Sequence, residues 1–201
     1  WVGGTARGRP GSRGRGGQRC RARGGLAGGV EASGVREDGR RFWLAREAAE
    51  ALAERKARAV AQRRAGSRSL VIGAETIVVL GEGEEERLLS KPGGPAEARQ
   101  MLEALSGTCH RVITGVCVVR ALDGVGRTAH EQTRVSMRPI LPLEIEAYVE
   151  SGEWSGKAGG YAIQENADAF VESLEEGGFD NVVGLPVDLT LGLLAALESP
   201  A

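Results

Sequence analysis

The chain has 201 residues, of which 41% are hydrophobic and only 4% aromatic, so it is long enough for one domain with an aliphatic core. It contains no apolar run of about eighteen residues, and its N-terminal end has arginines without an apolar stretch, so we expect neither a membrane span nor a secretory signal. The three cysteines, Cys20, Cys109 and Cys117, form no CxxC pair. This pattern argues against a disulfide framework or a zinc site and predicts a cytoplasmic protein.

The charge is distributed unevenly along the chain. Residues 1–29 contain seven Arg and no Asp, Glu or Lys, so the net charge of −1 divides into +7 for this segment and −8 for the remainder. We therefore separate an Arg/Gly-rich segment, residues 1–32, from a globular domain, residues 33–201. The first segment has too few large apolar residues to offset chain entropy, and we expect it to be disordered. The acidic domain gives no reason to expect nucleic-acid binding.

Three origins of the first segment remain open. It is an Arg/Gly-rich tail that binds nucleic acid, a linker or expression artefact, or the mis-framed start of a GC-rich gene. Shifted GC-rich codons yield Arg, Gly, Pro and Ala, which are the residues that dominate here. We favour the mis-framed start.

Helical and strand patterns alternate along the remaining chain. They predict helices over residues 44–64, 95–105, 143–151 and 187–197. They predict strands over residues 69–80, interrupted at 73–76, and over residues 111–120 and 128–138, which pair as a hairpin. Residues 81–87 are expected to form a polar turn, and residues 162–174 a strand followed by a helix. This order predicts an α/β fold with a mixed twisted sheet and flanking helices.

An acidic residue, Glu75, lies within the apolar run SLVIGAETIVVL. Burying a carboxylate without a partner is costly, so Glu75 indicates a functional site more than a core position. A salt bridge or a strand-end position remains the alternative. Thr76 adds a hydroxyl at the same place.

Lysine is rare in this chain. Only Lys56, Lys91 and Lys157 occur, against 23 arginines. A lysine is a compact point charge that suits phosphate, so each one is a candidate phosphate ligand, with simple solvation as the alternative. Lys157 precedes Gly159-Gly160, which permit close backbone approach to a ligand, and Gln164 follows with an amide suited to a base edge or to a strand cap.

These features together resemble the Maf family of nucleotide pyrophosphatases, which has the inosine-triphosphate-pyrophosphatase-like fold. The resemblance extends over about residues 33–197. The matching stretches are VIGAET (71–76), SKP (90–92), MLEALSGTCHRVITGV (101–116), Thr133 and Val135, EIEAYVESGEWSGKAGGYAIQ (144–164), and FDNVVGLP (179–186).

The resemblance implies a reaction and a metal. Family members hydrolyse nucleoside triphosphates to the monophosphate and pyrophosphate with a divalent cation, Mg²⁺ or Mn²⁺. Glu75 matches the family's proton acceptor for the attacking water, where Asp is usual, and is a candidate metal ligand. A second acid of the family corresponds to Glu37 or Asp38.

The resemblance also implies roles in substrate binding. Thr76 and Gln164 match specificity residues, and Lys91 and Lys157, joined by Lys56, are expected to neutralise phosphate charge. The KAGxYxIQ form resembles the branch that acts on dTTP and UTP.

The chain departs from the family at its start. Members open with a strand and a Ser-x-Ser-Pro-Arg-Arg phosphate loop, and residues 1–29 contain no such motif. We therefore expect lower activity than in a chain with the complete loop. A catalytically impaired nucleotide-binding regulator of septum formation is the alternative function, a nucleic-acid binder acting through the Arg/Gly tail is a third, and a homodimer is expected from the family.

Overall fold

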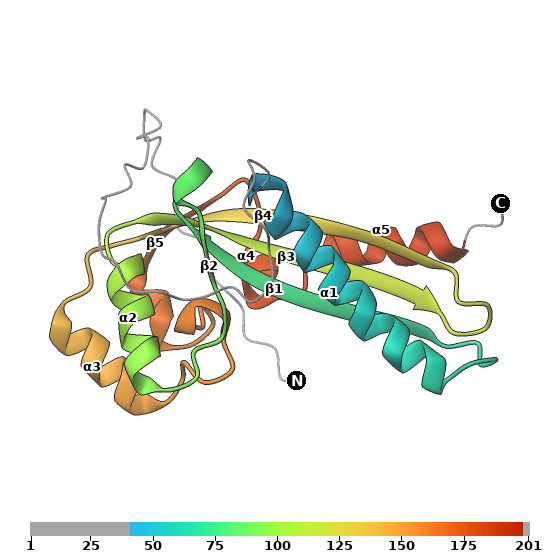
Figure 1. Cartoon of the computed structure of the whole chain (residues 1–201), viewed down its shortest axis with the longest axis horizontal. Coiled ribbons are helices and arrows are strands. Elements are labelled where there is room, and N and C mark those ends of the chain that lie inside the picture. Colours follow the sequence, from blue (N-terminus) through green and yellow to red (C-terminus); the bar gives the residue numbers. More distant parts are fainter. Residues whose placement is uncertain (1–40, 199–201) are drawn as a thin grey trace, which may run out of the picture.

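The computed structural model of the chain describes residues 41–198, so the predictions for residues 1–32 and for Glu37 and Asp38 lie outside the described residues. One sheet with the strand order β2-β1-β3-β4-β5 forms the centre of the fold (Figure 1). Its strands are β1 (Leu70–Leu80), β2 (Arg87–Leu89), β3 (Cys109–Arg120), β4 (Gly126–Met137) and β5 (Val171–Glu175). The α-helices are α1 (Arg41–Arg63), α2 (Pro95–Leu105), α3 (Pro142–Ser151), α4 (Phe179–Val183) and α5 (Val187–Glu198). Three short 3-10 helices are η1 (Gly83–Glu85), η2 (Ala158–Gly160) and η3 (Asn166–Phe170).

The predicted α/β class with helices flanking a sheet is confirmed, but the pairing differs from a mixed sheet. All four pairings between the described strands are antiparallel. The connections explain two of these pairings, because residues 81–86 between β1 and β2 and residues 121–125 between β3 and β4 are too short for a parallel crossover. The predicted hairpin of β3 and β4 is confirmed.

Helix α1 lies along one face of β1 and β3, and α5 lies on the opposite face of the sheet (Figure 1). Alanines spaced four residues apart form the contact surface of α1, and they are Ala45, Ala49, Ala53, Ala57 and Ala61. Under them lie Gly73 and Gly115, where a Cβ atom would come 2.5 Å from the Ala53 carbonyl oxygen and 2.4 Å from that of Ala49. Small residues on both sides therefore bring the helix backbone against the strands.

The expected interruption of the first strand at residues 73–76 is wrong. Strand β1 pairs with β3 without a break, and Glu75 lies opposite Gly115. Gly73 is part of the strand because the close helix requires a residue without a side chain there. The order expected for residues 162–174 is also wrong, since η3 precedes β5; the mixture of apolar and polar residues there did not distinguish the two orders. Strand β2 and helix α4 were not predicted, and each is five residues or shorter.

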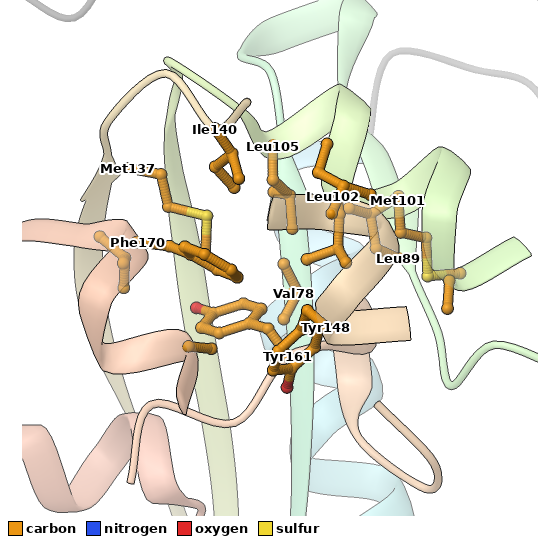
Figure 2. Close-up of a cluster of buried hydrophobic side chains, with 14 of the residues drawn as sticks. Val78, Leu89, Met101, Leu102, Leu105, Met137, Ile140, Tyr148, Tyr161 and Phe170 are labelled. Carbon is orange, nitrogen blue, oxygen red and sulfur yellow. The ribbon is translucent and has the colours of Figure 1, made fainter. Parts of the chain in front are cut away.

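The main hydrophobic core lies between the sheet and the helices α2 and α3. Figure 2 shows Leu102 and Leu105 of α2 pointing toward the same centre as Val78 of β1. Tyr148 of α3 packs edge-on against Phe170, with ring centroids 5.5 Å apart. This core supports one wall of the cavity described below. Among the described helices, none combines the length and the apolar composition that crossing a membrane requires.

Candidate active site

A cavity of about 280 Å³ opens beside β1 and collects most of the predicted site residues. Its lining includes Glu75 and Thr76 from β1, and Gln164 from the loop after η2. It also includes the three lysines of the chain, Lys56, Lys91 and Lys157. These lysines come from α1, from the segment after β2 and from the segment before η2, so the fold brings together charges that are far apart in the sequence.

Glu75 and Lys56 form an ion pair between β1 and α1. The Glu75 side chain is 16% exposed and the Lys56 side chain 48%, so the carboxylate is sheltered while its partner stays in contact with solvent. Lys56 also donates a hydrogen bond of 3.3 Å to the Ala74 carbonyl oxygen. Helix α1 therefore holds the Lys56 ammonium group at the Glu75 carboxylate. Gly115 pairs with Glu75 and lies against Ala49 of α1, and this contact fixes the position of the helix relative to the carboxylate.

Thr76 points to the other face of the sheet, as alternate residues of a strand do. Its hydroxyl lies 3.0 Å from the Thr114 hydroxyl on the neighbouring strand β3. Glu75 and Thr76 nevertheless line one cavity, because β2 pairs only with Val78–Leu80 among the described residues. The cavity thus reaches around the outer edge of β1, with the carboxylate on one side and the hydroxyl on the other.

The segment that carries Lys157 is fixed by its glycines. Gly159 adopts φ +69° and donates a hydrogen bond of 3.1 Å to the Ser90 carbonyl oxygen, next to Lys91. A Cβ atom there would lie 3.1 Å from the Val78 side chain, so a larger residue would push the segment off the sheet. The Lys157 Nζ atom lies 4.0 Å from Oε1 of Glu165, the residue that follows Gln164.

A buried pair, His110 and Tyr161, anchors the end of this segment. The Tyr161 hydroxyl lies 2.8 Å from His110 Nε2, and the rings meet edge-on at 5.5 Å. Burial lowers the pKa of His110 to about 3 and raises the pKa of Tyr161, because neither charged form is solvated there. Both side chains are therefore neutral at physiological pH, and the pair serves as a fixed support for the cavity wall.

Within residues 41–198, no cluster of three or more His, Cys, Asp or Glu side chains is placed to hold a metal ion. Glu75 is the acidic residue that lines the described cavity. One carboxylate is sufficient for a Mg²⁺ ion whose other ligands are waters and substrate phosphates. The donor set therefore fits a cation that arrives with a polyphosphate, and the three ammonium groups fit the phosphates.

Two residues near the cavity were not singled out from the sequence. Thr114 contacts Thr76, and Asn181 at α4 contacts Thr114 through its carbonyl oxygen. A signal for Thr114 was present, because it is a polar residue within the apolar run RVITGVCVVR, as Glu75 is within its own run. Asn181 carries no such pattern, since only the fold places α4 against β3.

The fold and this cavity define an α/β protein with a cationic pocket suited to an anionic, phosphate-bearing ligand. The chain belongs to the Maf-like protein family, whose model matches residues 22–197.

Relatives within the family are named for one activity. The chain is 47% identical over 142 residues to the dTTP/UTP pyrophosphatase of Brucella abortus (strain 2308), covering 70% of this chain and 65% of that protein. It is 46% identical over 154 residues to the protein of the same name from Symbiobacterium thermophilum, covering 77% and 75%. A third relative with this name, from Moorella thermoacetica, is 48% identical over 147 residues, covering 73% and 72%. The matched part thus spans slightly less than two thirds of the Brucella protein.

Proposed function

We propose that this chain is a nucleoside triphosphate pyrophosphatase that acts on dTTP and UTP. The observation that carries the proposal is that all three lysines of an arginine-rich chain line one cavity with Glu75. A triphosphate carries several negative charges, and compact ammonium groups can neutralise them from different directions. The names of the three relatives support the same activity and the same two nucleotides.

In the proposed reaction, Glu75 is the general base. A water molecule attacks the α-phosphorus, and its oxygen forms the new bond to phosphorus while Glu75 accepts its proton. The bond from the α-phosphorus to the bridging oxygen breaks, so that pyrophosphate leaves and the monophosphate remains. A positioned general base of this kind contributes roughly 10²–10⁴-fold to the rate.

The lysines bind and orient the polyphosphate. Lys91 and Lys157 lie on neighbouring segments joined by the Gly159–Ser90 hydrogen bond, so they approach the ligand from one wall. Lys56 approaches from α1 beside Glu75. In the proposed complex Lys56 also holds the carboxylate in place for proton transfer.

The proposal includes a divalent cation, Mg²⁺ or Mn²⁺, held by Glu75 together with phosphate oxygens of the substrate. When bound, the cation would neutralise charge that develops on those oxygens. The second acid expected from the family, Glu37 or Asp38, lies outside the described residues.

Thr76 and Gln164 are proposed to contact the base. Both line the cavity, and Thr76 is half-buried while Gln164 is exposed at the rim. A half-buried hydroxyl and a rotatable amide are suited to read the polar edge of a pyrimidine.

Pyrophosphate release tests the proposed function. The full chain is incubated with Mg²⁺ and a panel of the common ribo- and deoxyribonucleoside triphosphates, and pyrophosphate and monophosphate are quantified. We expect both products in equal amounts, most rapidly from dTTP and UTP. Binding of these nucleotides without release would instead favour the nucleotide-binding regulator.

A further inference from the structure

A chain of hydrogen bonds with a fixed direction begins at Thr76 and leads away from the cavity. The Thr76 and Thr114 hydroxyls lie 3.0 Å apart. Thr114 donates its hydroxyl hydrogen to the Asn181 carbonyl oxygen at 2.9 Å. A threonine hydroxyl has one hydrogen, and a carbonyl oxygen only accepts. Because the Thr114 hydrogen is directed to Asn181, Thr76 must be the donor in the bond between the two threonines.

The acceptor at the end of this chain is held in place by the Asn181 side chain. Asn181 is fully buried, and its amide nitrogen donates to the Val112 carbonyl oxygen at 3.1 Å and to the Thr133 hydroxyl at 2.9 Å. Thr133 donates in turn to the Gly178 carbonyl oxygen at 3.2 Å. A flipped amide would place its oxygen against the Val112 carbonyl oxygen, so this orientation is determined. The Asn181 carbonyl oxygen also accepts a hydrogen bond of 3.0 Å from the Gly184 N–H group, so side-chain and backbone bonds together hold Asn181 against Thr114.

The direction of these hydrogen bonds decides whether Thr76 offers a donor or an acceptor to a ligand. Its hydrogen points inward to Thr114, so only its lone pairs face the cavity that it lines. A Cβ atom at Gly184 would lie only 3.0 Å from this oxygen, so a larger residue at this position would crowd it. Thr76 is thus presented as a hydrogen-bond acceptor.

Uracil and thymine carry a hydrogen on ring nitrogen N3, whereas the N3 of cytosine is itself an acceptor. We propose that Thr114, held by Asn181, fixes Thr76 as an acceptor for the N3–H group of uracil and thymine, and that this excludes cytosine nucleotides. Thr114 is a positioning residue, because it acts through Thr76 and does not touch the base. The exposed Gln164 can contact either base, since its amide can present its oxygen or its nitrogen, so the fixed donor-acceptor choice comes from Thr76. The inference rests on the proposed function only in that the cavity binds pyrimidine nucleotides.

Equilibrium binding of UMP and CMP to the full chain tests the inference without any turnover. We expect wild type to prefer UMP, and Thr114→Val to reduce the ratio of the two affinities about tenfold, because the freed Thr76 hydroxyl can then donate to cytosine N3. Thr114→Ser keeps the hydroxyl and should retain the wild-type ratio. Thr190→Val is the matched control, since the buried Thr190 hydroxyl also donates to a backbone carbonyl, that of Pro186, but outside the cavity.

An unchanged ratio in Thr114→Val, or a lost ratio in Thr114→Ser, would overturn the inference. If Thr114→Val does not fold, wild type provides a second test with the monophosphate of N3-methyluridine, which lacks the N3–H group. We expect it to bind at least tenfold more weakly than UMP, as expected for an acceptor left without its donor. Equal binding of the two would contradict the inference. Failure of the proposed reaction would appear separately, as absent pyrophosphate release with the nucleotide preference intact.

Discussion

The Lys56 ammonium group, on the helix that covers the sheet, forms an ion pair with the Glu75 carboxylate at the edge of β1. The pair links the packing of α1 to the chemistry of the cavity. Its position depends on the alanine surface of α1 and on Gly73 and Gly115, which let the helix backbone approach the strands. Features that determine stability and features that determine activity therefore meet at this helix.

Replacing Lys56 should separate activity from stability. We expect Lys56→Gln to lower kcat/KM for dTTP about tenfold or more, because a charge-assisted contact is lost at the base and the phosphates. The free energy of unfolding should change by roughly 1 kcal/mol, because the Lys56 side chain is half-exposed although the Glu75 carboxylate that it leaves is sheltered. Steady-state kinetics and urea unfolding measure the two effects. Arg55→Gln, the neighbouring exposed cation of α1, is the control, and an equal loss of activity there would contradict a specific role.

The contribution of Lys91 and Lys157 to nucleotide binding should increase with the number of phosphate groups on the nucleotide. We expect Lys91→Gln and Lys157→Gln each to weaken binding of a non-hydrolysable triphosphate analogue about tenfold, and binding of the monophosphate less. Calorimetric titration of both ligands measures the difference. Exposed Arg127 on β4, which does not line the cavity, provides the control Arg127→Gln. Equal weakening for triphosphate and monophosphate would assign these lysines to another part of the ligand.

Two glycine-to-alanine substitutions, one under α1 and one in α5, should have opposite effects on the free energy of unfolding. Gly115→Ala should destabilise the protein by about 1–3 kcal/mol or more, because the new methyl group would lie 2.4 Å from the Ala49 carbonyl oxygen. Gly192→Ala, in α5 with no neighbouring atom within 4 Å, should stabilise it by roughly 0.5–1 kcal/mol through helix propensity. Urea unfolding of both variants tests this. A Gly115→Ala variant as stable as wild type would show that α1 can move away from β3 at little cost.

The buried His110 predicts a loss of stability on mild acidification. Its pKa is lowered to about 3 in the folded protein, below the ordinary value of 6.5. Between these values the unfolded chain binds the extra proton, so the free energy of unfolding falls as pH decreases, by up to about 1.4 kcal/mol per pH unit. Above about pH 6.5 His110 is neutral in both states, so the stability is not reduced by its titration there. The lowered pKa of Glu144, about 2, affects stability only at lower pH.

Urea unfolding at pH 7.5 and pH 5.5 therefore isolates the histidine, and His110→Gln is the matched variant, because its amide can still bond to Tyr161 without titrating. We expect wild type to lose about 1 kcal/mol more than His110→Gln between the two pH values. Equal losses in both proteins would assign the pH dependence to other groups.

Local sequence patterns predicted the longer elements of this fold well. Helix α2 was predicted with its observed bounds, because a proline in the first turn and a glycine-containing segment after the end mark both ends. The strands β1 and β3 were recognised from their β-branched, apolar residues, and β4 from the alternation of its residues. Strand β2 and helix α4 are too short for a periodic pattern, and their existence depends on tertiary pairing with β1 and packing on β3.

The cavity was predictable only in part. Glu75 was identified from its position in an apolar strand. The rarity of lysine made the three lysines candidate phosphate ligands, but nothing local indicates that residues 56, 91 and 157 meet. The partnership of Thr76 with Thr114 depends on the register between β1 and β3, in which the two residues are direct neighbours. A sequence pattern that names each threonine does not specify this register.

Pyrophosphate release by wild type, Glu75→Gln and Glu75→Asp tests the central claim most directly. Glu75→Gln nearly preserves the shape of the side chain but removes the base, and Glu75→Asp restores the carboxylate on a shorter stem. With dTTP and Mg²⁺, we expect Glu75→Gln to lower kcat by about 10²–10⁴-fold, and Glu75→Asp to retain much more of it. Binding of the triphosphate analogue to all three proteins controls for an intact cavity. A Glu75→Gln variant that binds the analogue and releases pyrophosphate at the wild-type rate would contradict the assignment of Glu75 as the base.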